Sequence, residues 1–129
     1  MIIAIDGPAA SGKGTLAKRI AQHYGFHFLD TGLLYRAVAY HTISGGFIPF
    51  DAWAALAVAR NLRDSIMDNP ALRTIEIGEK ASIIASIPEV RKELLIYQRS
   101  FALKKPGVVL DGRDIGTVVL PTANIKIFV

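Results

Sequence analysis

The sequence contains no cysteine in its 129 residues, which excludes disulfide bonds, thiolate metal sites and cysteine nucleophiles. Long hydrophobic runs are also missing, since the longest, residues 52–59, is far shorter than the ~20 residues that cross a membrane. The apolar stretch at the N-terminus is short, has no basic flank and meets Asp6 at once, so it does not resemble a signal peptide. We therefore expect a cytoplasmic protein with no membrane partner.

A run of basic residues is absent too, although basic side chains outnumber acidic ones. The 15 lysines and arginines exceed the 11 acidic residues and give a net charge of +4. Without a basic run or a groove-reading motif, nucleic acid is not an expected partner. The excess of positive charge suits small phosphorylated molecules instead, if the arginines lie beside a nucleotide-binding loop.

The chain alternates apolar runs with helical patterns, which is typical of an α/β protein whose parallel sheet is covered by helices on both faces. We expect buried strands at residues 2–5, 26–29, 108–112 and 125–129. The expected helices are 13 to about 24, 31–44, 52 to about 64, 70–87 and 88–101, although residues 74–77 would also fit a strand. No repeat or linker interrupts the pattern, so residues 1–129 are predicted to form a single domain.

Several residues define these helices. Leu16, Ile20 and Tyr24 recur every four residues along the first one. Pro70 suits a first helical position. Trp53 and Met67 are interpreted as packing residues.

The segment "GPAASGKGT", residues 7–15, follows the first strand directly and opens the first helix. This context is typical of a phosphate-binding loop, in which glycines allow backbone angles that other residues avoid and N–H groups cradle phosphate oxygens. The helix N-terminus and a flexible lysine add positive charge. Gly14 stands where the general pattern has Ser or Thr, so Thr15 is only a weak candidate for direct magnesium binding. The residues predicted to bind the phosphates of a nucleotide are Gly7, Pro8, Ala9, Ala10, Ser11, Gly12, Lys13, Gly14 and Thr15.

Polar residues also follow the second and third strands, where the carboxyl ends of parallel strands meet. Thr31 and Arg36 come after one, and Asp111, Arg113 and Asp114 end the other in "VVLDGRDIG". Arg36 could grip a phosphate with two hydrogen bonds, and Asp111 fits a carboxylate on the magnesium side of a nucleotide. From the residues alone, a capped helix with a surface arginine and a tight Asp-Gly turn remain possible.

The motif "GKGT" resembles the nucleoside monophosphate kinases, and "DGRDIGTVV" is similar to the cytidylate kinase family within them. The resemblance implies a phosphate-loop parallel sheet flanked by helices, with a helical acceptor-binding region at about residues 31–105. It implies transfer of a phosphoryl group from ATP, with Mg²⁺ held by Asp111 through water, to CMP or dCMP. Lys13, Arg36 and Arg113 would be catalytic, and Thr31 would lie near the ribose.

Two further segments resemble cytosine-binding elements of the same family. These are Ala81-Ser82 and "PEVR" at residues 88–91. By this resemblance Ser82, Arg91 and Asp114 would contact the base, although Ser82 and Arg91 taken alone look like ordinary helix-surface residues. An Asp acceptor with Ser and Arg donors would complement the cytosine edge.

The sequence departs from the family in two respects. It lacks the arginine-bearing lid and the later elements, so we expect a C-terminal part to be absent, and residues 64–74 are too short for the extra small sheet of many relatives. The expected function is phosphorylation of CMP or dCMP by a monomer. A kinase for another monophosphate such as UMP, or a nucleotide-binding fragment without turnover, remains an alternative.

Overall fold

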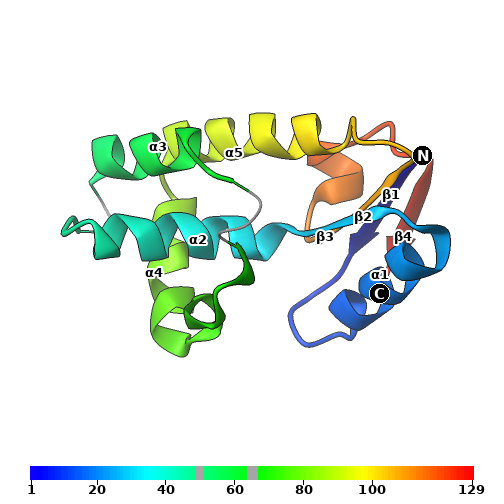
Figure 1. The fold of residues 1–129 in the computed structure, drawn as a ribbon, viewed down its shortest axis with the longest axis horizontal. Helices are drawn as coiled ribbons and strands as arrows, with labels where there is room; N and C mark the ends of the chain where they lie inside the picture. Colours follow the sequence, from blue (N-terminus) through cyan, green and yellow to red (C-terminus); the bar gives the residue numbers. More distant parts are fainter. Residues whose placement is uncertain (49–50, 64–66) are drawn as a thin grey trace. The chain divides into compact units, whose positions relative to one another are not determined.

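The fold is described by a computed structural model covering residues 1–48, 51–63 and 67–129 (Figure 1). The chain divides into two compact units, which are described separately below. Unit 1 consists of residues 1–31 and 97–129, and unit 2 consists of residues 32–96. The single domain expected from the sequence stays a prediction.

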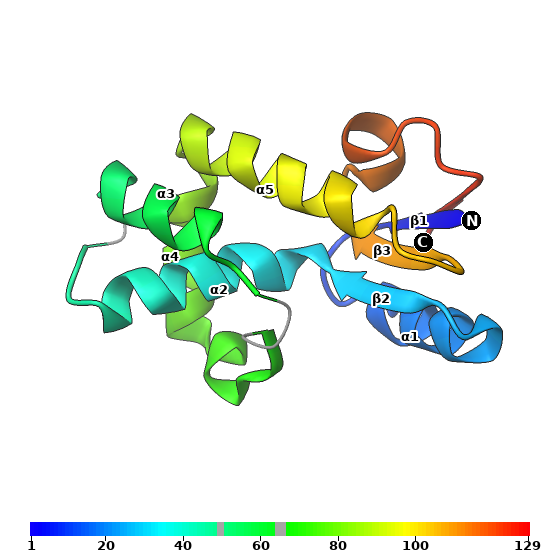
Figure 2. The same ribbon diagram turned by 45° about the horizontal axis from the view of Figure 1, so that its top comes forward.

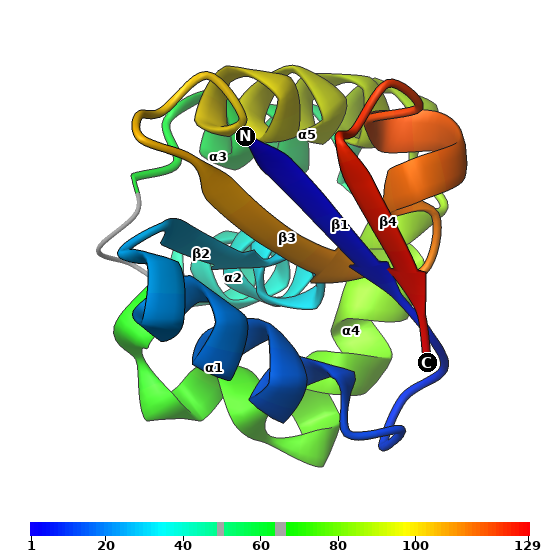
Figure 3. The same cartoon turned by 90° about the vertical axis from the view of Figure 1, so that its right-hand side faces the viewer.

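Unit 1 is built on a parallel sheet of four strands in the order β2-β3-β1-β4 (Figure 3). The strands are β1 (Ile2–Asp6), β2 (His27–Asp30), β3 (Val108–Gly112) and β4 (Ile125–Phe128). The α/β class and the parallel sheet are therefore confirmed. Every residue of β3 is buried, as expected for an apolar strand in the interior of a parallel sheet.

The fourth strand differs from the prediction of a buried strand. Ile125 and Phe128 of β4 are exposed, and only Ile127 packs against the core. The physical reason is position: β4 pairs with β1 alone and lies at the edge of the sheet in the described chain. Its apolar composition therefore does not make it an interior strand.

Helix α1 (Lys13–Tyr24) has the predicted bounds, and Gly25 ends it in a left-handed conformation. Its buried face is formed by Ala17 and Ala21, whereas Leu16 and Tyr24 from the apolar pattern are exposed. Ala17 and Ala21 pack with Ile3, Ile5 and Val109 of the sheet. Small side chains allow the helix to approach the strands closely, so size rather than hydrophobicity selects this face.

The other face of the sheet carries two elements of unit 1 (Figure 3). One is the last turn of α5 (Pro88–Phe101), where Phe101 is buried and its ring meets His27 edge-on. The other is η3 (Ile115–Val119), a wide helical turn that contacts β1 and β3. Together with α1 they cover the sheet on both faces, as the alternating pattern predicted.

Unit 2 is helical (Figures 1 and 2). Its elements are α2 (Thr31–Ser44), α3 (Ala52–Arg60), the short turn η2 (Pro70–Arg73), α4 (Ile75–Ala85) and most of α5. Residues 74–77 begin a helix, so the alternative of a strand there is wrong. The helix expected to continue to about residue 64 ends at Arg60, and residue 64 lies outside the described residues.

Local capping explains where these helices start. The side chain of Asp51 accepts a hydrogen bond from the N–H of Ala54 at 3.1 Å, and that of Thr74 accepts one from Ile77 at 3.3 Å. Each bond satisfies an N–H group that has no partner inside its own helix. Pro70 occupies the first turn of η2, as predicted.

One of the two residues interpreted as packing residues lies outside the core of unit 2. Trp53 is 83% exposed, so its interpretation as a packing residue is wrong, while Met67 is half-buried. Helix α3 instead buries Ala55 and Ala59, and the larger buried side chains come from the other helices. These are Leu34, Val38, Leu72, Ile84, Val90 and Leu94.

Within the described ranges 1–48, 51–63 and 67–129, no helix is both long enough and apolar enough to cross a membrane.

The packing of α1 generates a test of its buried face. We expect Ala17→Leu to destabilise the full-length protein by about 1–3 kcal/mol, because the added methylenes have no room against the sheet. Leu16→Ala removes a side chain that is already 37% exposed and should cost less, about 1 kcal/mol. Urea unfolding of both variants measures this, and a larger loss in Leu16→Ala than in Ala17→Leu would contradict the packing.

Candidate active site

The loop after β1 adopts the conformation of an anion-binding turn. Ala10 and Gly12 have positive φ angles of 58° and 87°, and Lys13 begins α1 directly afterwards. Gly12 therefore has the unusual backbone angle that was expected of a glycine at this position. Ala10 also has a positive φ angle, which is unfavourable for a residue with a side chain. Positive-φ residues alternating with others turn successive N–H groups toward one concave side.

Gly7 is required for a different reason from the one expected. Its φ is not in the left-handed region, so the prediction that it supplies unusual backbone angles is wrong. A Cβ atom at this position would lie 2.8 Å from the carbonyl oxygen of Val129 and 3.1 Å from Ser11 Oγ. The extended course of β1 continues into Gly7, so the glycine provides space.

Several polar groups of this loop have no partner in the described chain. The N–H groups of Ala9, Ala10, Ser11 and Gly12 find no acceptor there, and the buried Ser11 Oγ makes no hydrogen bond. Buried hydroxyl groups and backbone N–H groups in proteins almost always have partners. At the positive end of a helix, such a set of donors is suited to a bound phosphate.

The residues that follow the loop differ in their surroundings. Lys13 is half-buried and its charge acts on Asp111. A Cβ at Gly14 would lie 3.5 Å from Asp111 Oδ2, so the first turn of α1 lies close to that carboxylate. Thr15 is exposed, and no residue of the described chain forms a hydrogen bond with its side chain.

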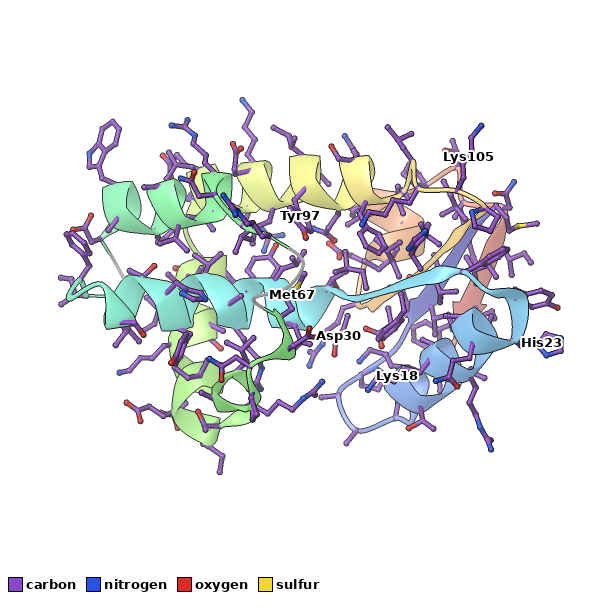
Figure 4. The ribbon with its side chains drawn as sticks, viewed as in Figure 1. Lys18, His23, Asp30, Met67, Tyr97 and Lys105 are labelled. Atoms are coloured by element: carbon purple, nitrogen blue, oxygen red, sulfur yellow. The ribbon has the colours of Figure 1, made fainter. Side chains whose placement is uncertain are left out.

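Asp111 carries the unusual electrostatics of unit 1. The carboxylate is 2% exposed at the end of β3, opposite Asp30 in the register of β2. Burial, and then repulsion from and hydrogen bonding with Asp30, raise the pKa of Asp111 to about 7, while Lys13 and Lys18 oppose the rise. Figure 4 labels Lys18 on α1 and Asp30 at the end of β2. The end of β3 therefore places a buried carboxyl group beside a second acidic side chain.

Thr31 supports this corner of the sheet from the start of α2. Its buried hydroxyl donates a hydrogen bond of 2.8 Å to the backbone carbonyl of Asp111. A Cβ at Gly112 would clash with Thr31 Oγ1, so the glycine after Asp111 is needed for this contact. The hydrogen bond joins the ends of β2 and β3.

Arg113 and Asp114 follow in the turn after β3. Arg113 is exposed, and its guanidinium contacts no hydrogen-bonding or charged partner among the residues that the structure describes. Asp114 is half-buried, and its backbone carbonyl accepts the N–H groups of Val118 and Val119 at the start of η3. The pair thus presents a free cation beside a carboxylate.

Arg36 is held inside unit 2 by backbone carbonyls. Its Nη1 donates to Leu72 O at 2.8 Å and to Thr74 O at 3.1 Å. The guanidinium occupies the space above Gly78, where a Cβ would lie 2.8 Å from Nη2. Sequence reasoning missed Gly78, although a glycine in the interior of a helix is a recognisable signal of close approach.

Ser82 lies farther along α4, and Arg91 lies in the first turn of α5. Ser82 Oγ donates to Gly78 O at 3.3 Å, and Arg91 Nη1 donates to Ala85 O at 3.3 Å. Positions 78, 82 and 85 fall on one face of an α-helix. The structure therefore brings Arg36 and Ser82 to Gly78 of α4, and Arg91 to the carbonyl at the C-terminal end of that helix. The three separate sequence positions did not reveal this.

The predicted residues thus form two groups. Unit 1 gathers the loop at residues 7–15 with Thr31, Asp111, Arg113 and Asp114, and unit 2 aligns the remaining three along α4. Sequence reasoning also missed the contacts of Asp6 and Arg99. Asp6 is a buried carboxylate that accepts the N–H groups of Ile115 and Gly116, and Arg99 donates to the carbonyls of Val118 and Val119.

The raised pKa of Asp111 predicts a pH-dependent stability. Because the folded-state pKa of about 7 exceeds the ordinary 3.8, the folded protein holds a proton that the unfolded chain releases. This stabilisation is present below about pH 4 and is lost as the pH rises to about 7, a change of at most about 4 kcal/mol. Asp111→Asn should remove this dependence, so its unfolding free energy should exceed that of the parent most at pH 8.

The measurement is urea unfolding of the full-length protein and of Asp111→Asn between pH 4.5 and 8, without nucleotide or divalent cation. The difference between the two proteins isolates Asp111 from other titrating groups. A difference that is constant across this pH range would contradict the raised pKa.

Comparisons with known proteins show which family this chain belongs to. The family model described as cytidylate kinase matches residues 3–129. Curated cytidylate kinases from Bradyrhizobium sp. (strain ORS 278), Rhodopseudomonas palustris (strain ATCC BAA-98 / CGA009) and Nitrobacter winogradskyi are each 57% identical over 129 residues. These matches cover 100% of this chain and 61% of each relative, so the chain spans about three fifths of their length. The chain belongs to the cytidylate kinase family.

Proposed function

We propose that this chain provides the ATP-binding and acceptor-binding residues of an enzyme that phosphorylates CMP or dCMP. The observation that carries the proposal is the set of N–H groups at residues 9–12, which have no partner in the described part of the chain and lie at the N-terminus of α1 beside Lys13. Such a set suits the phosphates of ATP. The relatives named cytidylate kinase support CMP or dCMP as the acceptor. The cytoplasm, where ATP is made and spent, is the compartment that this proposal implies.

Mg²⁺ fits the chemistry around Asp111. Magnesium prefers oxygen ligands and often binds through one or two carboxylates together with substrate phosphates and water. The carboxylates of Asp111 and Asp30 supply such oxygens, and their mutual repulsion would be relieved by a cation. We assign Asp111 as the metal-side residue, acting through water, whereas the exposed Thr15 has no contact that supports a role as ligand.

The chain's own residues would act mainly by positioning and by screening charge. The loop N–H groups and Lys13 would hold the ATP phosphates, and Arg36 and Arg113 would hold the acceptor phosphate. An acceptor phosphate oxygen is already an anion, so attack on the γ-phosphorus needs no general base. As negative charge spreads over the transferred group, fixed cations lower the barrier most effectively, and Arg113 is a cation of unit 1 with no partner among the described residues.

Selection of the base would depend on polar groups that match the cytosine edge. Cytosine presents an N4 amino donor beside acceptors at N3 and O2. Ser82 on α4 and Arg91 on α5 offer donors, and Asp114 offers an acceptor for the amino group. Thr31 is proposed to lie near the ribose, with its hydroxyl already donating to Asp111 O.

Two alternatives make different predictions. A kinase for UMP would bind uracil in preference to cytosine. Uracil carries a carbonyl acceptor at the position where cytosine carries the amino donor. A nucleotide-binding protein without turnover would bind ATP and CMP but form no CDP. Calorimetry with CMP, dCMP, UMP and AMP separates the acceptors, and equal or tighter binding of AMP would exclude the cytidine assignment.

Incubation of the full-length protein with ATP, Mg²⁺ and CMP should yield CDP, measured by chromatography. We expect Arg113→Gln and Arg36→Gln each to lower kcat/KM for CMP by about 10²-fold or more, because each removes a phosphate contact. Arg19→Gln is the matched control, since Arg19 is exposed on α1 and has no partner among the described residues. Unchanged activity in both arginine variants would contradict the assignment.

Gly78→Ala tests the placement of Arg36. An added Cβ would displace the guanidinium, which is the flexible end of a side chain, so the backbone has no need to move. We expect the thermal midpoint to hold or rise, because Ala favours a helix over Gly by about 1 kcal/mol, while affinity for CMP falls several-fold. Glu79→Ala, at an exposed position of the same helix, is the control and should leave CMP binding unchanged. A drop in stability without a drop in CMP affinity would refute this role of Gly78.

A further inference from the structure

The wide turn η3 follows Arg113 and Asp114 directly and is bonded at its start by Asp6. Asp6 lies at the end of β1, is 8% exposed, and uses both carboxylate oxygens. Oδ1 accepts the N–H of Ile115 at 2.8 Å, and Oδ2 accepts the N–H of Gly116 at 2.9 Å. These are N–H groups that the turn itself cannot satisfy.

The other end of η3 is bonded by Arg99, from the last turn of α5. Its Nε donates to Val119 O at 3.0 Å and its Nη2 donates to Val118 O at 3.3 Å. A negative group thus meets the N–H end of the turn, and a positive group meets its carbonyl end. Both signs match the dipole of the turn, and hydrogen bonds to charged groups are the stronger class.

The turn needs this support because its internal bonds are of an uncommon type. The N–H of Leu120 donates to Ile115 O at 2.7 Å and that of Val119 donates to Asp114 O at 3.1 Å, each spanning five residues. Such wide turns are rare and often lie at functional sites. The charged groups of Asp6 and Arg99 provide bonds that the short turn lacks.

Arg113 and Asp114 are therefore held between two fixed points. On one side Gly112 ends β3, where its carbonyl accepts the N–H of Gly7 at 3.1 Å. On the other side Ile115 and Gly116 are bonded to Asp6. Asp6 and Gly7 are adjacent, so the start of the phosphate-binding loop also defines the place of the Arg113–Asp114 pair.

We propose that Asp6 and Arg99 are positioning residues that hold Arg113 and Asp114 in place for the acceptor nucleotide by clamping the two ends of η3. The proposal rests on the proposed function of Arg113 and Asp114. It assigns to Asp6 and Arg99 no contact with substrate: each acts through the backbone of η3. Loss of either should therefore affect the acceptor and spare ATP.

The first experiment uses the full-length protein and its variants Arg99→Gln and Arg99→Lys, with Arg19→Gln as the control. We expect Arg99→Gln to raise the Kd and KM for CMP about tenfold, with the Kd for ATP changed less than about twofold. Lysine can still donate to one carbonyl, so Arg99→Lys should recover part of the loss. A simple loss of folding would lower binding of ATP and CMP together.

A double-mutant comparison then tests whether Arg99 acts through the pair. In the background Arg113→Gln/Asp114→Asn, adding Arg99→Gln should weaken CMP binding by less than about twofold, because nothing remains to be positioned. The same tenfold loss in that background, or no loss in Arg99→Gln alone, would overturn the proposal. If Arg113→Gln/Asp114→Asn itself leaves CMP binding unchanged, the proposed function of the pair fails instead, and the positioning role falls with it.

Hydrogen exchange of the backbone amides tests the clamp without any nucleotide. Asn at position 6 keeps one acceptor oxygen but turns an NH₂ group toward the second N–H. Asp6→Asn should therefore speed exchange at Ile115 or Gly116 about tenfold, and Arg99→Gln should do so at Val119 and Leu120, while β3 stays protected. Unchanged exchange at all four amides would show that η3 is not held by these residues and would overturn the proposal.

Discussion

The parallel pairing of β1 with β3 is the constraint on which the rest of unit 1 depends. It places Ile5 opposite Asp111 and Asp6 opposite Gly112, so two segments about a hundred residues apart leave the sheet side by side. One becomes the phosphate-binding loop and the other the turn with Arg113 and Asp114. The hydrogen bond from Gly7 N–H to Gly112 O continues the pairing past the last residue of β1. A shift of register by one residue would separate Asp6 from the N–H groups of η3.

The same sheet also brings two acidic side chains together. Because β2 joins β3 in register, Asp30 lies opposite Asp111, and two carboxylates share a buried corner beside Lys13. Burial, and then the neighbouring Asp30, raise the pKa of Asp111 and disfavour its charged form. In unit 2 the corresponding constraint is steric. Gly78 makes α4 less stable than alanine would, but its lack of a Cβ leaves space for the guanidinium of Arg36.

Much of the fold was predictable, and the errors have identifiable causes. Apolar runs with flanking glycines located the strands and α1, because β-branched segments and left-handed glycine caps are local signals. Trp53 was assigned to the core from residue type alone, yet it is 83% exposed, since the small residues Ala55 and Ala59 form the buried face of α3. Likewise, the apolar residues of β4 do not indicate that this strand lies at the edge of the sheet in the described chain. Burial depends on which elements become neighbours, and local pattern does not contain that information.

The sequence by itself determined the phosphate-binding loop, the capped helices, the alternating α/β pattern and the motif that marks the family. Each of these is a short-range property, decided by residues within a few positions of one another. The tertiary structure alone decided that Asp6 and Arg99 form hydrogen bonds with η3, that Asp30 meets Asp111, and that Ser82 and Arg91 bond to backbone carbonyls of α4. These contacts join residues distant along the chain, and only strand register and helix packing fix which of many possible polar partners come within hydrogen-bonding distance.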